Sequence, residues 1–193
     1  MTNLLPYDGT VNYYKDVFKD EHSTNYIEVL LENIQWENDQ AFLFGRHHVL
    51  KRKAAWYGDK FFEYKYAGTV KTALQWTPEL LEIKTCVERL TGHSYNSCLL
   101  NLYESGSEGM SWHSDNEKTM EEGSAIASVS FGAARTFYFK HKTDQIKVQV
   151  NLENGSILLM LGSTQKHWLH SLPKSKKVLD LRINLTFRTF IEK

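Results

Sequence analysis

The three consecutive residues His113-Ser114-Asp115 form the sharpest local candidate for metal chemistry in this 193-residue sequence. On an extended segment, side chains two positions apart point to the same side, with Cα atoms roughly 6–7 Å apart. Both can therefore bind one ion through bonds of about 2.1 Å. A third ligand must come from elsewhere, and His167 and His170 both qualify. Two imidazoles and one carboxylate on one side of an ion leave the opposite positions open, as in non-haem Fe(II) oxygenases.

The cysteine content argues against a different kind of metal site. The sequence has two cysteines, Cys86 and Cys98, and no Cys-x-x-Cys pair. A structural zinc site is closed by four ligands, typically cysteine and histidine, and these residues do not supply them. A histidine and an aspartate in a polar surface loop would share the His-x-Asp spacing, so other parts of the chain must decide between the two interpretations.

The end of the chain adds a candidate site for an anion. Apolar and polar residues alternate there, which predicts a strand with Arg182, Asn184, Thr186 and Arg188 on one face. The ordinary interpretation is a half-exposed strand with a solvated polar face. Two guanidinium groups could instead bind a dicarboxylate through forked hydrogen bonds. Asn101 and Tyr103, also two positions apart, could donate to the same anion.

Together these motifs resemble the AlkB family of iron- and 2-oxoglutarate-dependent dioxygenases. The resemblance is strong from about residue 99 to 188 and extends more weakly to about residue 42; the first forty residues contribute little. It implies that Fe(II) is held by His113, Asp115 and His170, and it favours His170 over His167 because His170 precedes Ser171-Leu172-Pro173. The implied 2-oxoglutarate site comprises Arg182 for the distal carboxylate, Arg188 near the keto-acid end and Asp115, and Asn101, Tyr103, Asn184 and Thr186.

The activity implied by the resemblance is oxidative dealkylation of N-alkylated bases in DNA, such as 1-methyladenine and 3-methylcytosine. O₂ and 2-oxoglutarate are consumed, and succinate and formaldehyde are released. Because the pairing edge of a base is hidden in a duplex, the enzyme must act on single strands or flip the base out. A related dioxygenase acting on RNA or protein, and a non-catalytic jelly-roll binding module, are the alternatives.

Several residues are candidates for contacting alkylated DNA. Tyr64 and Tyr66 share a strand face by spacing. The resemblance favours them over Trp56 and Tyr57 as the aromatic clamp on the base, because by position they match the base-contacting aromatic residues of duplex-acting relatives. Three further assignments come from position. Phe44 would be a wedge in a hairpin, Arg52 and its basic neighbours would contact phosphates, and Glu117 stands near the place where some relatives carry a further acidic residue.

The charge balance and the apolar pattern exclude other classes of protein. Lys and Arg total 23 and Asp and Glu total 23, so the net charge of zero argues against indiscriminately basic nucleic-acid binding. No apolar run approaches the ~18 residues of a membrane span, and the N-terminal residues do not resemble a signal peptide. We expect a soluble, cytoplasmic protein without an obligate protein partner.

The elements that must position these residues follow from periodicity and capping signals. Helices are predicted over about 23–33 and between Thr77 and Gly92, the second with an apolar stripe of Leu80, Ile83, Val87 and Leu90. Strands are predicted at 96–103, 125–131, 135–141, 146–151, 156–161 and 181–190. We expect an α+β chain with a double-stranded β-helix (jelly-roll) core. Its single domain, 1–193, would divide into N-terminal helices with a nucleotide-recognition hairpin region, about 1–95, and a catalytic core, about 96–193.

Overall fold

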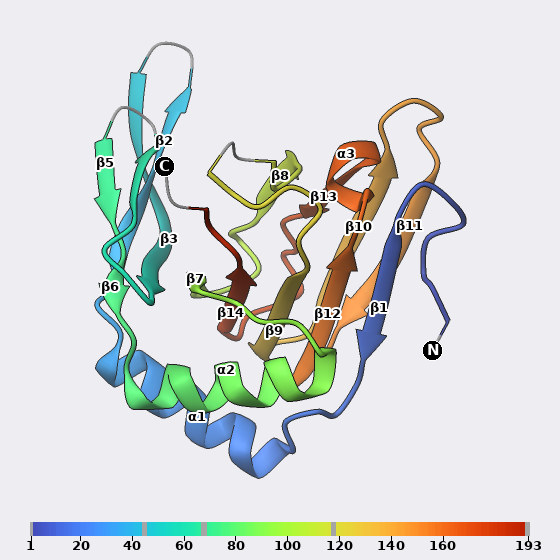
Figure 1. Cartoon of the computed structure of the whole chain (residues 1–193). Coiled ribbons are helices and arrows are strands. Elements are labelled where there is room, and N and C mark those ends of the chain that lie inside the picture. The colour runs from blue at the N-terminus through green and yellow to red at the C-terminus, as the bar shows by residue number, and fades with distance from the viewer. Residues whose placement is uncertain (1, 44–45, 67–68, 117–118, 192–193) are drawn as a thin grey trace.

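The computed structural model describes residues 2–43, 46–66, 69–116 and 119–191 (Figure 1). For 41–43, 47, 64–66 and 69–71 the backbone is described without the side chains. Within these ranges, no helix has both the length and the apolar character needed to cross a membrane.

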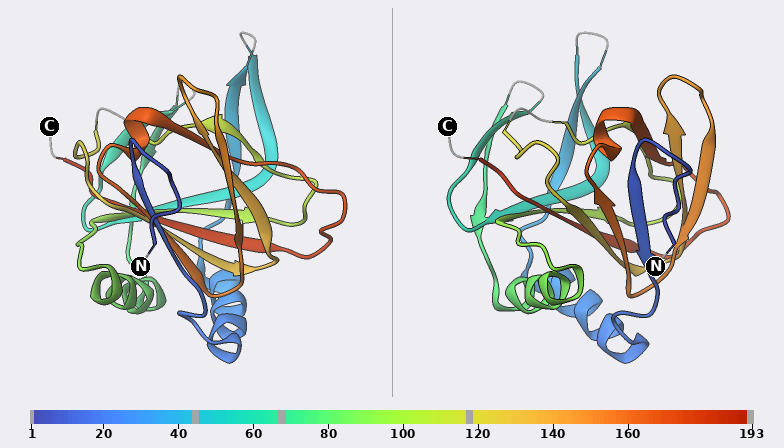
Figure 2. Two further views of the ribbon diagram at one scale, coloured as in Figure 1. Left: turned by 90° about the vertical axis from the view of Figure 1, so that its right-hand side faces the viewer. Right: turned by 45° about the vertical axis from the view of Figure 1, so that its right-hand side comes forward.

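Two antiparallel sheets form the body of the molecule (Figures 1 and 2). The large sheet has the strand order β1 (Thr10–Tyr14), β12 (Ser156–Leu161), β9 (Ile126–Gly132), β14 (Arg182–Arg188), β7 (Ser97–Tyr103), β3 (Arg46–Gly58) and β2 (Glu37–Leu43), with β6 (Leu74–Gln75) parallel to β3. The small sheet has the order β11 (Lys147–Leu152), β10 (Arg135–His141), β13 (Trp168–Leu172) and β8 (Met110–His113). A separate hairpin consists of β4 (Glu63–Tyr66) and β5 (Thr69–Thr72).

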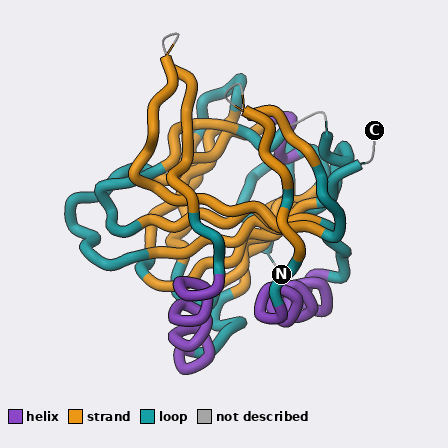
Figure 3. Tube along the Cα trace, turned by 90° about the vertical axis from the view of Figure 1, so that its left-hand side faces the viewer, coloured by secondary structure: helices purple, strands orange, loops and turns teal. Residues whose placement is uncertain are grey.

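Helices α1 (Asp20–Asn33) and α2 (Pro78–Thr91) lie together on one side of the strands, whereas α3 (Thr164–His167) lies on the other (Figure 3). The predicted capping of α2 is confirmed: the Thr77 hydroxyl accepts the Leu80 N–H at 3.4 Å, and Gly92 ends the helix at φ 73°. A left-handed residue of this kind favours glycine because a Cβ would be strained there. The predicted apolar stripe is wrong at its last member, since Leu90 is 39% exposed.

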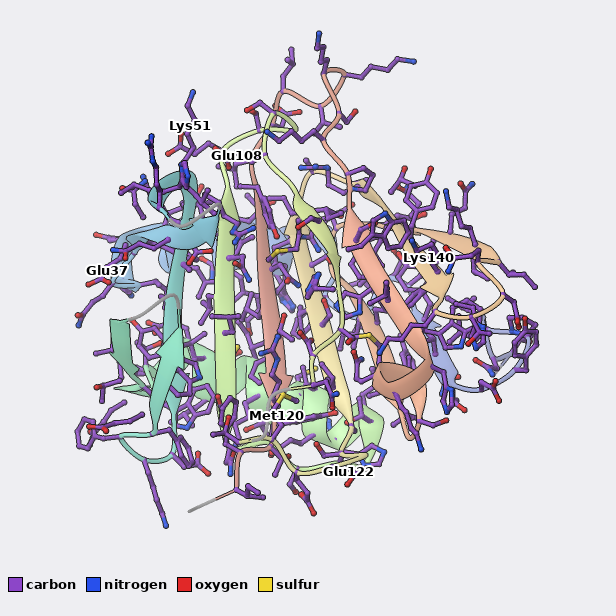
Figure 4. All side chains as sticks on the ribbon, turned by 90° about the horizontal axis from the view of Figure 1, so that it is seen from above. Glu37, Lys51, Glu108, Met120, Glu122 and Lys140 are labelled. Atoms are coloured by element: carbon purple, nitrogen blue, oxygen red, sulfur yellow. The ribbon has the colours of Figure 1, made fainter. Side chains whose placement is uncertain are left out.

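Apolar residues form two packed layers, one on each face of the large sheet. The helices pack on the outer face, where Leu80 and Ile83 of α2 join Leu185 and Phe187 of β14 in one buried cluster. The second cluster contains Leu158 of β12 together with Phe139 and Trp168 of the small sheet. Seen from above, Lys51 of β3 and Lys140 of β10 lie on opposite sides of the large sheet's central strands (Figure 4).

The predicted fold class is confirmed, with one correction to the order of elements. Helices do not simply precede strands, because β1 comes before α1 and β2 to β6 lie between α1 and α2. Strands β1, β2 and β3 hydrogen-bond into the same sheet as β7, so residues on both sides of position 95 build that sheet. Strands β8 and β13 were not predicted, because they have four and five residues and are too short to show a sustained alternation of apolar and polar residues.

Candidate active site

The three residues predicted to bind a metal come together between the two sheets. His113 at the end of β8 stands opposite His170 of β13, and their Nε2 atoms are 3.1 Å apart. Asp115 Oδ1 lies 3.9 Å from the Nε2 atom of His113. One ligand atom from each residue lies within 4.8 Å of the others. His167 is not part of this triad; its ring is stacked parallel to that of His141.

Asp115 is held by contacts from α3 and β14. Strand β8 ends at His113, so the aspartate lies two residues beyond that strand. The Asp115 backbone N–H donates to Gln165 Oε1 of α3 at 2.9 Å. An Arg188 guanidinium nitrogen of β14 lies 2.9 Å from Asp115 Oδ1. These contacts hold the carboxylate beside the two imidazoles.

The electrostatics of the triad favour the protonation states that bind metals. Burial lowers the pKa of His170 to about 3, with the charges of His113 and Arg188 acting in the same direction. Burial by itself would raise the pKa of Asp115, but the charges of Arg188, His170 and His113 outweigh it and leave that pKa below its ordinary value. His170 is therefore neutral and Asp115 ionised near pH 7, as metal ligation requires.

The polar face of β14 is buried, not solvated. All seven residues of the strand are buried between β7 and β9. In the register, Arg182 stands opposite Tyr103, and Asn184 stands opposite Asn101. The predicted alternation is thus confirmed, but both faces lie inside the protein: the apolar one beneath the helices and the polar one on the side of the second sheet.

Arg182 is a buried cation without an ion-pair partner among the described residues. It is 2% exposed, and one guanidinium nitrogen donates to Ser130 Oγ at 2.9 Å. Its Nε has no hydrogen-bond partner among the described residues, and no carboxylate of this part of the chain forms an ion pair with it. Burial lowers its pKa to about 10. A buried charge without compensation is costly, so this position fits an anionic ligand.

The remaining residues predicted for the co-substrate differ in how free they are to contact it. Tyr103 is buried, with its ring centre 5.6 Å from the Arg182 guanidinium. The Asn184 amide donates to Ser128 Oγ at 2.8 Å and to the Val129 carbonyl at 2.9 Å. The Thr186 hydroxyl donates to the side-chain oxygen Oδ1 of Asn184 at 3.2 Å. Asn184 and Thr186 are therefore engaged within the sheet.

A cavity of about 420 Å³ opens beside the triad. Its lining includes the predicted residues Asn101, Arg52, His113, Asp115 and Arg188 and also Asp39, Ala54, Trp56, Leu99, Met110, Ser111, Ser114, Asn116 and Phe190. The volume lies within the roughly 300–1,000 Å³ typical of small-molecule sites. The apolar members were missed except for Trp56, although Leu99 could have been found because it precedes Asn101 by two positions on the same strand face.

The residues predicted to contact DNA differ in whether the structure describes their side chains. Arg52 is 5% exposed, forms an ion pair with Asp39 and donates to the Gly109 carbonyl at 3.1 Å. This placement differs from the solvent-facing position of a phosphate contact. Phe44 and Glu117 lie outside the described residues, and the backbone of Tyr64 and Tyr66 forms β4 while their side chains lie outside the description.

Of the two clamp candidates whose side chains are described, Trp56 lines the cavity and Tyr57 does not. Its indole N–H donates to Ser97 Oγ at 2.6 Å, and its ring packs near those of Phe62 and Phe190. Tyr57, the next residue, is 2% exposed in the helix-side core. The alternation of β3 thus directs one of these two aromatic residues toward the cavity and the other away from it.

The chemistry of these side chains fits iron and a dicarboxylic acid. Imidazole, carboxylate and imidazole on one side of an ion suit Fe(II) and leave coordination positions open. Arg182 supplies an uncompensated cation deeper between the sheets, on the strand that also carries Arg188. The donor set therefore matches a metal that binds a chelating acid.

Comparison with known proteins gives the same family. The family model of the 2OG-Fe(II) oxygenase superfamily matches residues 10–188. The chain is 41% identical over 157 residues to the human protein named DNA oxidative demethylase ALKBH2, covering 77% of this chain and 60% of that protein. It is 35% identical over 172 residues to human alpha-ketoglutarate-dependent dioxygenase alkB homolog 3, covering 84% of this chain and 60% of that protein. The chain thus spans about three fifths of these relatives.

A solved structure supports the fold. The structure described as OsALKBH1 superimposes with a TM-score of 0.67 at 18% sequence identity, covering 93% of this chain and 97% of that chain. At this identity the likeness shows the fold alone. The family model and the curated relatives confirm the family inferred from the motifs: the chain belongs to the 2OG-Fe(II) oxygenase superfamily and, within it, to the AlkB family.

Proposed function

We propose that the protein is an Fe(II)- and 2-oxoglutarate-dependent dioxygenase that dealkylates N-alkylated bases in DNA, releasing succinate and formaldehyde. The observation that carries the proposal is the triad of His113, Asp115 and His170, of which His113 and Asp115 line a cavity of about 420 Å³. Arg182 of β14, buried and without an ion-pair partner among the described residues, supports the use of a dicarboxylic co-substrate.

Each residue of the site has a separate task in this proposal. Fe(II), together with 2-oxoglutarate and O₂, supplies the oxidation of the alkyl carbon. His113, Asp115 and His170 would hold the ion, and Arg188 orients Asp115 through its 2.9 Å contact. Arg182 would bind the distal carboxylate through a charge-assisted hydrogen bond.

The apolar part of the cavity suits a flipped base. Trp56 and Leu99 line it together with the polar residues, and Phe190 packs against the Trp56 ring. An aromatic wall can stack on the face of any base, and apolar walls keep water from the reacting carbon. We propose Trp56 as a base contact in addition to Tyr64 and Tyr66.

We propose DNA as the substrate polymer because of what the similar proteins are named for. The first of them carries the name DNA oxidative demethylase, and its match covers 77% of this chain. Inside the cavity, Arg52 is compensated by Asp39, so we infer that phosphate binding falls to exposed residues such as Lys51.

The test is a substrate panel with two readouts. Purified protein with Fe(II), 2-oxoglutarate and O₂ is given matched methylated oligonucleotides as single-stranded DNA, duplex DNA and RNA. Succinate and formaldehyde are then measured, and equal amounts of the two are expected. The proposal expects turnover on DNA, at least tenfold faster than on the unmethylated oligonucleotide. Turnover on RNA alone would replace DNA with RNA as the substrate.

Two variants separate catalysis from binding. His113→Ala removes a ligand from a half-buried position and is expected to abolish succinate formation, whereas His93→Ala changes an exposed histidine outside the site and is expected to retain full activity. Binding of oligonucleotide without any succinate in the unaltered protein would support a non-catalytic binding module and overturn the proposal.

A further inference from the structure

A second cluster of potential metal-binding side chains lies where β10 ends and β13 begins. It consists of Asp8 before β1, His141 at the end of β10 and His167 at the end of α3, with one ligand atom of each within 4.8 Å of the others. The N-terminal segment runs close to α3 in both views of Figure 2, and the Thr10 N–H donates to Thr164 Oγ1 at 3.0 Å. Three segments that are remote in sequence therefore meet here.

His141 has an unused nitrogen directed into this cluster. The residue is 4% exposed, and its Nε2 lacks a hydrogen-bond partner among the described residues. Asp8 Oδ2 is 3.4 Å from that nitrogen, close enough for an ion pair but not aligned for a hydrogen bond. Two ligand atoms at about 2.1 Å from an ion with tetrahedral geometry are about 3.4 Å apart, and each lies off the other's lone-pair axis. The observed spacing matches that arrangement.

The other nitrogen of His141 faces a carboxylate. The Asp144 backbone N–H donates to Nδ1 at 3.2 Å, and Asp144 Oδ2 lies 3.2 Å from the same nitrogen. The Tyr7 hydroxyl donates to that Oδ2 at 2.7 Å and holds it in place. When Nε2 binds a metal, the ring proton moves to Nδ1, and the Asp144 carboxylate then replaces the backbone N–H as the hydrogen-bond partner of that nitrogen. Histidines that bind metals usually have such a partner on the second nitrogen.

The histidine rings are also fixed by their neighbours. The His141 and His167 rings are parallel within 9° at a centroid distance of 6.3 Å. The Trp168 ring packs edge-on against His141 at 5.0 Å, and its indole N–H donates to the Tyr7 carbonyl at 3.1 Å. Side chains that are already ordered lose little conformational entropy when an ion binds.

We propose that Asp8, His141 and His167 bind a Zn²⁺ ion at a site separate from the triad. Two imidazoles and one carboxylate form a donor set that zinc accepts with near-tetrahedral geometry, leaving the fourth position for water. The ion would fasten the N-terminal segment to the end of β10 and to α3. Because Trp168 begins β13 two residues before His170, the site would secure the strand that carries one triad histidine.

Zinc titration of the untagged full chain tests the proposal independently of any oxygenase activity. His113→Ala/Asp115→Asn serves as the parent, so that the triad itself cannot take up zinc. After chelator treatment and dialysis, Zn²⁺ is added in competition with a chromophoric chelator. One equivalent of Zn²⁺ per chain is expected. Adding Asp8→Asn or His167→Gln to this parent should weaken its Zn²⁺ affinity by at least about tenfold. Loss of a hydrogen-bond partner of a ligand already costs about that much, and loss of the ligand itself costs more.

Asp16→Asn provides the matched control, because Asp16 is also an exposed aspartate near the N-terminus with a left-handed backbone, φ 52° compared with 53° for Asp8. It should bind zinc like the parent. Zinc should also raise the melting temperature of the parent and of Asp16→Asn but not of Asp8→Asn, since a ligand stabilises only the fold that binds it. Absence of zinc binding by the parent, or equal binding by parent, Asp8→Asn and His167→Gln, would overturn the proposal. Because Asp8 and His167 are not fully buried, their variants test the site without depending on the core.

Discussion

The two faces of strand β14 are equally buried but have opposite chemistry. Ile183, Leu185 and Phe187 point to the helix side, where they pack in a buried apolar cluster. Arg182 and Arg188 point to the other sheet; Arg188 contacts Asp115, whereas Arg182 has a guanidinium nitrogen without a partner among the described residues. Burial alone therefore does not mark a structural residue. Whether the polar groups of a buried side chain are satisfied separates the residues that stabilise the fold from those that await a ligand.

Two buried arginines repeat this contrast around a single ring. The guanidinium groups of Arg135 and Arg182 lie 5.9 and 5.6 Å from the centre of Tyr103. Arg135 donates to the carbonyls of Glu108 and Pro173 at 2.8 and 2.9 Å, which ties two loops together. Arg182 has one side-chain partner, Ser130, among the described residues, and its Nε has none. We assign Arg135 to the fold and Arg182 to the co-substrate.

The largest expected effect is on stability, from the apolar face. Leu185→Ala removes a fully buried side chain from the central strand and should lower the free energy of unfolding by about 3–4 kcal/mol. Urea denaturation followed by circular dichroism measures this change. The folded fraction should keep the 2-oxoglutarate KM of the unaltered protein. A changed KM at unchanged stability would show that the apolar face of β14 contributes to co-substrate binding and not to stability.

Arg182→Met should have the converse effect. Removing the cation should raise the KM for 2-oxoglutarate by about 100-fold, equivalent to about 2.7 kcal/mol, because a buried charge pair with the co-substrate is lost. The free energy of unfolding should stay level or rise, since an uncompensated buried charge is removed as well. Initial-rate kinetics and urea denaturation check both parts. A large loss of stability with an unchanged KM would move the carboxylate site elsewhere.

Arg135→Met is the matched substitution on the structural arginine. It leaves the Glu108 and Pro173 carbonyls without their donor and should cost about 2 kcal/mol of unfolding free energy. The KM for 2-oxoglutarate should change by less than about threefold, corresponding to well under 1 kcal/mol. If Arg135→Met and Arg182→Met raised the KM equally, both arginines would belong to the anion site.

The sequence predicted what local chemistry determines and missed what depends on distant partners. The ends of α2 follow from Thr77, Pro78 and Gly92, which act on adjacent backbone groups, and the structure has them at those positions. The alternation in β14 was also visible. Its burial was not, because that depends on β7, which lies about eighty residues earlier in the chain. Family motifs supplied the triad assignment, since the loop after β8 does not follow from periodicity.

Arg52 and His141 show the same limit. Arg52 lies in a run of basic residues that suggests a phosphate-binding surface, yet Asp39, across the β2–β3 hairpin, holds it inside the protein. The cluster around His141 joins residues 8, 141 and 167, so no spacing in the sequence indicates it. Both arrangements arise from tertiary contacts that a single sequence does not encode as a pattern.

Ser130→Ala should produce the smallest effect and is the finest test of the contrast within β14. Ser130 Oγ accepts a 2.9 Å hydrogen bond from Arg182, and losing it should weaken the orientation of the guanidinium without removing its charge. One such bond contributes about 1 kcal/mol, so the KM for 2-oxoglutarate should rise by about fivefold. Ser128→Ala, on β9 like Ser130, is the matched control, because Ser128 contacts Asn184 and not Arg182. This variant should change the KM by less than about twofold, under about 0.5 kcal/mol. Equal effects of the two serine variants would mean that the sheet as a whole, and not the position of Arg182, sets the affinity for the co-substrate.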